Sequence, residues 1–170
     1  MGAVYWITGL AGAGKTTIGK AFFERLRQKY INAVFLDGDT MRKIFCDDLG
    51  YTQEERRKCA MRYAKLCALL EMQDIKVVCC TISMFDSVRE WNRKNIPNYY
   101  EIYIKASMGT LINRNQKGLY SSSSEGRSKD VAGISFTVEE PKNPDLVLEN
   151  EGNRTAEELA DYIVNEIGLV

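Results

Sequence analysis

A glycine-rich stretch near the start of the chain limits its possible folds more than any other feature. Residues 9–17 read GLAGAGKTT and fit G-x-x-x-x-G-K-[ST], the phosphate-binding loop (P-loop) of nucleoside triphosphate enzymes. An apolar run at 4–8 precedes the loop, as a buried strand would. Apolar side chains then recur at spacings of three and four, as in a helix. This order of strand, loop and helix is the context that a P-loop requires.

The residue types of the loop suit a nucleotide donor with Mg²⁺. Glycines let the backbone approach an anion closely, and successive N–H groups can then point at its oxygens. Lys15 supplies a charge for the β- and γ-phosphates, and Thr16 a hydroxyl for the metal. A simple turn would need neither the lysine nor the spacing. The predicted ATP-binding residues are Gly9, Ala11, Gly12, Ala13, Gly14, Lys15, Thr16 and Thr17.

Charge and hydropathy exclude several classes of partner. The 170 residues contain 23 basic and 23 acidic side chains, so the formal net charge is zero. General binders of nucleic acid or of anionic membranes are usually basic, and neither partner is expected. No apolar run approaches 18 residues, and the N-terminus does not resemble a secretory leader. A cytoplasmic location is the resulting expectation.

Two residue types restrict the chemistry further. The chain has no histidine, so a general base must be a carboxylate or a less usual group. Its five cysteines are odd in number and include no C-x-x-C pair, which predicts buried, reduced thiols rather than a zinc site or disulfides. They are Cys46, Cys59, Cys67, Cys79 and Cys80.

Strand and helix patterns alternate along the whole chain. Strands are predicted at 4–8, 33–36, 75–82, 99–105 and 146–148, and helices at about 18–26, 41–46, 52–70, 83–94, 107–115 and 155–167. Capping boxes mark two helix starts, Thr52 with Glu55 and Thr155 with Glu158. The alternation predicts one α/β domain over residues 1–170, with a five-stranded parallel sheet flanked by helices.

Two further segments suggest parts of an active site. Asp37 and Asp39 follow the second predicted strand, where ligand-binding groups of parallel sheets gather. Residues 116–136 are rich in serine, glycine and charged residues. Such a segment can be a disordered linker, but in a nucleotide enzyme it is more often a polar lid that excludes water from the phosphates.

The choice among P-loop proteins favours a kinase. No N-K-x-D sequence is present to read guanine, and the D-x-x-G match at 47–50 lies in a predicted loop. Small P-loop proteins with a polar lid are usually kinases of small molecules, an inference from fold alone. Two alternatives stay open: a kinase of another metabolite or nucleoside monophosphate, and an ATP-binding switch without turnover.

Several motifs together resemble the adenylylsulfate (APS) kinase family. Residues 6–17 are similar to its first motif, and LDGD at 36–39 with Arg42 to its second. DLGYT at 48–52 with Arg56 resembles the third, Ile82 and Ser83 part of the fourth, and KGLY at 117–120 the fifth. Residues 133–134 and 141–148 resemble the end of the lid and the last strand. The matches keep their order over most of the chain.

The resemblance implies a kinase that moves the γ-phosphoryl of ATP to a ribose 3′-hydroxyl, with Mg²⁺ held by ATP, Thr16 and Asp37. Asp39 is implied as base or metal contact, beside Asp37, and Lys15 and Lys117 as phosphate contacts. Arg114 would lie against the ATP adenine, and the resemblance also implies a homodimer. The implied acceptor-binding residues are Asp39, Arg42, Tyr51, Arg56, Cys59, Ile82, Ser83, Lys117 and Leu119.

Departures from the family cluster on the acceptor side. Thr40 and Cys59 stand where the family has asparagines, Asp86 stands where it has an arginine, and a serine-rich run replaces a basic lid segment. A site that loses an amide for reading a base edge should read a different base. Two acceptors therefore stay open: adenylyl sulfate, and cytidine 5′-diphosphoramidate, the substrate of APS-kinase-like enzymes of bacterial capsule biosynthesis.

Overall fold

The computed structural model describes residues 1–115, 118, 132–133 and 137–168, and its centre is one parallel β-sheet. The strands lie in the order β2-β3-β1-β4-β5, which confirms the predicted five-stranded parallel sheet. They are β1 (Ala3–Thr8), β2 (Ala33–Asp37), β3 (Lys76–Cys80), β4 (Tyr99–Lys105) and β5 (Leu146–Glu149). The predicted lid at 116–136 lies almost entirely outside the described residues.

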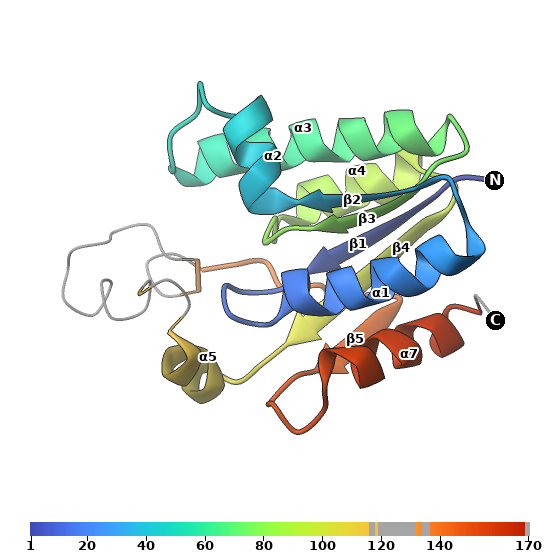
Figure 1. The fold of residues 1–170 in the computed structure, drawn as a ribbon. Coiled ribbons are helices and arrows are strands. Elements are labelled where there is room, and N and C mark those ends of the chain that lie inside the picture. Colours follow the sequence, from blue (N-terminus) through green and yellow to red (C-terminus); the bar gives the residue numbers. More distant parts are fainter. Residues whose placement is uncertain (116–117, 119–131, 134–136, 169–170) are drawn as a thin grey trace.

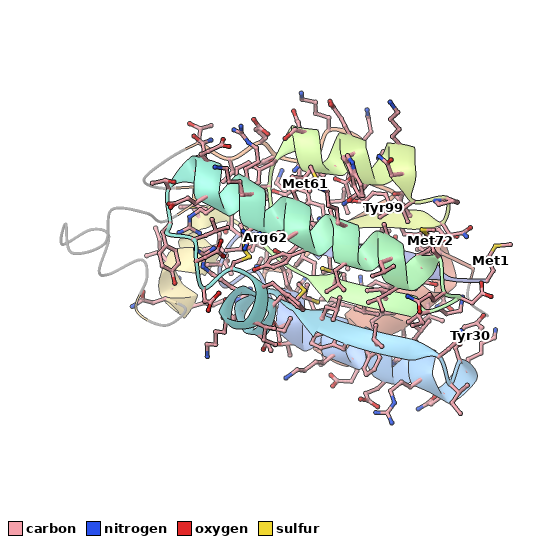
Figure 2. The ribbon with its side chains drawn as sticks, turned by 90° about the horizontal axis from the view of Figure 1, so that it is seen from above. Met1, Tyr30, Met61, Arg62, Met72 and Tyr99 are labelled. Atoms are coloured by element: carbon pink, nitrogen blue, oxygen red, sulfur yellow. A yellow bond between two sulfur atoms is a disulfide. The ribbon has the colours of Figure 1, made fainter. Side chains whose placement is uncertain are left out.

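Helices cover both faces of the sheet (Figure 1). One face carries α1 (Lys15–Lys29) and α7 (Ala156–Glu166), and the other carries α3 (Gln53–Glu71) and α4 (Asp86–Asn95). Two short helices, α2 (Gly38–Phe45) and α5 (Met108–Arg114), lie near the carboxyl ends of the strands. Figure 2 shows α2 beside α3. It also shows Met72, at the C-terminal end of α3, near Met1. The N-terminus and the C-terminal end of α7 lie at the edge opposite α2 and α5.

The central strand β1 explains why the sheet needs both layers. Every residue of β1 is buried, and its side chains alternate between two hydrophobic cores. Tyr5 and Ile7 pack with residues of α1 and α7, whereas Val4 and Trp6 pack with residues of α3 and α4. A strand covered on both faces is apolar throughout, which is why this run showed no polar alternation.

Helix starts follow local capping chemistry. Both predicted capping boxes are present, at Thr52 with Glu55 and at Thr155 with Glu158. The helix expected at 41–46 instead begins at Gly38, because the carboxylate of Asp37 accepts a hydrogen bond from the Thr40 amide (3.2 Å). Asp39 therefore belongs to the first turn of α2.

The helix expected at 83–94 begins later than predicted. Ser83 has a positive φ of 25°, its hydroxyl lies 2.6 Å from that of Thr81, and α4 starts only at Asp86. Residues 81–85 thus form a bent connection along the edge of the sheet. Met84 and Phe85 belong to this connection rather than to the helix, and both side chains are buried.

The cysteine prediction was partly wrong. Cys46, at the end of α2, and Cys59, in α3, form a disulfide, although they are separated by 13 positions in sequence. The packing of α2 against α3 brings them together, a tertiary contact with no local signature. Cys67, Cys79 and Cys80 are buried free thiols, as expected.

None of the helices in the described ranges is long and apolar enough to cross a membrane.

The disulfide gives a direct test by counting thiols. Protein denatured without reductant should alkylate at three cysteines, and at all five after reduction, as read by mass spectrometry. The bond closes a loop of about 14 residues, so reduction should lower the free energy of unfolding by about 2–4 kcal/mol in a urea titration. Five reactive thiols before reduction would contradict the assignment. The C46S/C59S double variant should match the reduced protein.

Candidate active site

The P-loop connects β1 to α1 at the carboxyl edge of the sheet. Gly9 and Gly14 have φ values of 148° and 102°, which side chains rarely adopt. A Cβ on Gly9 would lie 2.3 Å from the Ile104 carbonyl oxygen, so this turn also lacks space for a side chain. No side chain caps α1, so the amides of its first turn remain for an anion.

Lys15 and Thr16 begin α1 and point at different groups. The Lys15 Nζ donates to the Leu10 carbonyl oxygen (2.7 Å). Burial lowers the pKa of Lys15 to about 8, although Cys80, Asp39 and Asp37 nearby oppose that shift. The Thr16 hydroxyl donates to Asp37 Oδ2 (2.9 Å), so the P-loop and the carboxyl end of β2 meet directly.

One cavity of about 860 Å³ runs from the P-loop to α2 and α3. Of the predicted residues, Gly9 and Ala13 are not part of its lining, and Lys117 and Leu119 lie outside the described residues. The other predicted residues all line it, and they are Ala11, Gly12, Gly14, Lys15, Thr16, Thr17, Asp37, Asp39, Arg42, Tyr51, Arg56, Cys59, Ile82, Ser83 and Arg114.

Two arginines and a tyrosine form a cluster at the end of the cavity away from the P-loop. The Arg42 guanidinium lies 4.1 Å from the centre of the Tyr51 ring, and that of Arg56 lies 5.2 Å from it. Arg42 donates to the carbonyls of Leu49 and Gly50, and Arg56 Nε donates to that of Tyr51 (2.9 Å). The loop backbone thus holds both cations at the cavity, where they can bind an anion.

The wall beside this cluster is largely apolar. Cys59 contributes its disulfide sulfur, which lies 2.8 Å from the Tyr63 hydroxyl. That hydroxyl donates to the Gly38 carbonyl (3.3 Å), and burial raises the pKa of Tyr63, which keeps it protonated. Met84 and Phe85 complete the wall. None of these side chains offers the amide that an asparagine at position 59 would.

Asp86 does not line the cavity. Its carboxylate pairs with Lys142 (2.8 Å) and with Arg89, and these partners, Lys142 first, lower the pKa of Asp86. Arg89 is buried and also pairs with Glu101 (3.3 Å). The Asp86 carboxylate therefore stays ionised and paired within a network at the start of α4, and it does not contribute to the lining of the cavity.

Sequence reasoning missed several cavity residues. Tyr63 read as a core position on the apolar face of its helix, and nothing in the spacing of that face separates cavity wall from core. Asn150 carried a usable signal, because it lies two positions after the last predicted strand, at the edge where ligands bind. Arg154, four residues on, also lines the cavity.

Comparison with known proteins assigns this arrangement to a family. The family model described as adenylylsulphate kinase matches residues 1–149. A cytidine diphosphoramidate kinase from Campylobacter jejuni is 40% identical over 166 residues, covering 98% of this chain and 96% of that protein. A probable adenylyl-sulfate kinase from Aeropyrum pernix is 35% identical, covering 99% and 94%.

A solved structure shares the whole fold. The APS kinase CysC of Mycobacterium tuberculosis, in complex with AMPPNP and APS, superimposes with a TM-score of 0.90 and 29% identity, covering 98% of both chains. The family match spans the P-loop, the acidic end of β2, the arginine–tyrosine cluster and the last strand. On these grounds the chain belongs to the adenylylsulfate kinase family.

Proposed function

We propose that this protein transfers the γ-phosphoryl group of ATP to the ribose 3′-hydroxyl of a small nucleotide that ends in an anionic phosphoric anhydride group. The observation that carries the proposal is the single cavity joining the P-loop to Asp39 and the arginine–tyrosine cluster. Family membership supports an ATP-dependent phosphotransferase. Cytidine 5′-diphosphoramidate is the acceptor proposed first, and adenylyl sulfate is its competitor.

Three observations favour the cytidine nucleotide. A relative named for that activity is 40% identical, whereas seven relatives named as adenylyl-sulfate kinases or probable adenylyl-sulfate kinases are 31–36% identical. Cys59 occupies a disulfide where the family has an asparagine that can bind a base edge. Asp86 brings no positive charge to the cavity. Both substitutions fall in motifs that the resemblance assigns to the acceptor side, and the P-loop keeps its motif.

The reaction needs positioning and charge rather than covalent catalysis. The acceptor 3′-oxygen bonds to the γ-phosphorus, the bond from that phosphorus to the β–γ bridging oxygen breaks, and ADP leaves. Asp39 lines the cavity from the first turn of α2, and in this proposal it orients the hydroxyl and takes its proton. Lys15 stabilises charge on the transferring group, Arg42 and Arg56 hold the anionic end, and Tyr51 stacks on the base.

The residues present fit a magnesium ion carried by the nucleotide. The Thr16 hydroxyl and the Asp37 carboxylate lie together, 2.9 Å apart, at the start of α1. Within the described ranges, no group of three carboxylate or thiol side chains could hold a metal unaided, which suits an ion bound mainly by phosphates. When bound, Mg²⁺ would neutralise charge on the β- and γ-phosphates.

Asp39→Asn tests the proposed base. The amide cannot take the proton, so kcat should fall by about 10²–10⁴, while the acceptor KM changes only a few-fold. ADP release coupled to a spectroscopic readout measures both. The control is Asp47→Asn, the same change at an exposed loop position outside the cavity. Normal turnover of Asp39→Asn would refute its role.

The acceptor is tested by direct comparison. We expect kcat/KM for cytidine 5′-diphosphoramidate to exceed that for adenylyl sulfate by a factor of about 100 or more, because the apolar wall lacks the amide at position 59. Phosphorus NMR of the product should show a 3′-phosphomonoester. The reverse preference would make adenylyl sulfate the substrate, and turnover with neither would leave an ATP-binding protein or a kinase of another metabolite.

The lowered pKa of Lys15 predicts a pH dependence of ATP binding. Lys15 is charged below about pH 8 and increasingly neutral above it, so affinity for ATP should fall about tenfold from pH 7 to pH 9. Phosphates raise this pKa again, so binding near pH 8 should take up protons. Titration calorimetry in buffers of different ionisation enthalpy measures this uptake. The Lys15→Met variant should bind ATP weakly and without proton uptake. If its proton uptake equalled that of the wild type, Lys15 would not be the group that titrates.

A further inference from the structure

Asn150 reaches the P-loop from the far end of the sequence. It directly follows β5, and its backbone amide donates to the Lys105 carbonyl (2.8 Å), which continues the pairing of β5 with β4. Its side-chain Nδ2 donates to the carbonyl of Ala13, also at 2.8 Å. The approach is close, since a Cβ on Gly14 would lie 2.5 Å from the same nitrogen.

Arg114, in the last turn of α5, completes this contact. Its Nη1 donates to the Gly12 carbonyl (3.0 Å), and its Nη2 donates to the backbone carbonyl of Asn150 (3.0 Å). Two consecutive P-loop carbonyls, those of Gly12 and Ala13, are therefore held by side chains of Arg114 and Asn150. This gives Arg114 a contact beyond the adenine that the family resemblance implies.

The next residue ties the other end of α5 to the same loop. The Glu151 carboxylate accepts hydrogen bonds from the Ser107 amide (2.6 Å), the Ser107 hydroxyl (2.9 Å) and the Thr110 hydroxyl. These contacts lower the pKa of Glu151, the Thr110 bond first, so it stays ionised. Residues 150–151 thus fix α5 at both ends and fix the P-loop through Asn150.

The orientation of a P-loop peptide decides whether it attracts or repels phosphate. Each peptide unit is planar and trans, so an N–H that points inward at an anion requires the carbonyl to point outward. Ala13 is fully buried, and an outward carbonyl there needs a donor within the protein. Asn150 supplies that donor. Without the Asn150 side chain, the peptide unit between Ala13 and Gly14 could rotate. The Ala13 carbonyl oxygen would then leave its buried position and face the phosphates.

We propose that Asn150 is a positioning residue for the donor nucleotide: it holds the Ala13 carbonyl outward, so that the Gly14 N–H of the same peptide unit faces the phosphates of ATP. The inference rests on the proposed function for the identity of the donor. Asn150 acts through the P-loop, and no hydrogen bond or ring contact described above joins it to Arg42, Tyr51 or Arg56. Its loss should therefore weaken the donor and leave the acceptor unaffected.

Asn150→Asp is the sharpest variant, because it keeps the size and replaces the donor Nδ2 with an oxygen that repels the Ala13 carbonyl. We expect the KM for ATP and the dissociation constant for AMPPNP to rise about 10- to 100-fold, with the acceptor KM within twofold. Asn150→Ser, which keeps a shorter donor, should lie between Asn150→Asp and the wild type. The matched control is Asn153→Asp, three residues on and exposed.

Binding of tripolyphosphate separates this inference from the proposed function. Tripolyphosphate probes the P-loop without a nucleotide base and without turnover. If the wild type binds it and Asn150→Asp binds it more weakly, the positioning role is supported even if no acceptor is phosphorylated. Equal rises in both KM values, or ATP and tripolyphosphate affinities within twofold of wild type, would overturn it. Thermal unfolding of each variant shows whether it folds, and if Asn150→Asp does not, Asn150→Ser decides on the same criteria.

Discussion

The P-loop backbone imposes the constraint on which the rest of the site depends. Its N–H groups must converge on an anion, so its carbonyls need partners elsewhere. The structure supplies them from three places: Lys15 donates to the Leu10 carbonyl, Arg114 to that of Gly12, and Asn150 to that of Ala13. The parallel sheet matters because it brings the ends of β1 and β5 to the same edge.

The acceptor half uses different means. No glycine loop shapes it; instead, α2 and α3 are joined by the Cys46–Cys59 disulfide, and the loop between them is held by two arginines. The contacts of the arginines with backbone carbonyls and with Tyr51 organise the cations before any ligand binds. Cys59, where the sequence departs from the family, lies in this half, so the proposed acceptor wall is altered while the proposed donor site keeps the P-loop motif.

Short-range patterns predicted most of the fold, and long-range contacts limited the rest. The P-loop, the five strands and both capping boxes depend on residues within about ten positions of each other, so the sequence alone was enough. The partners of Cys46, Asp86 and Asn150 depend on which elements pack together. The family resemblance named most of the residues that line the cavity, but it could not show that Asp86 is not among them.

One carboxylate belongs to both halves of the site. Asp37 Oδ2 accepts from the Thr16 hydroxyl at the start of α1, while its Oδ1 caps α2, the helix that carries Asp39. A donor complex that draws the Thr16 hydroxyl toward a metal would weaken its hydrogen bond to Asp37, the residue that caps α2. By thermodynamic linkage, if one ligand changes the affinity for the other by some factor, the second ligand changes the affinity for the first by the same factor. In the proposed reaction, any coupling between donor and acceptor that passes through Asp37 would therefore act in both directions.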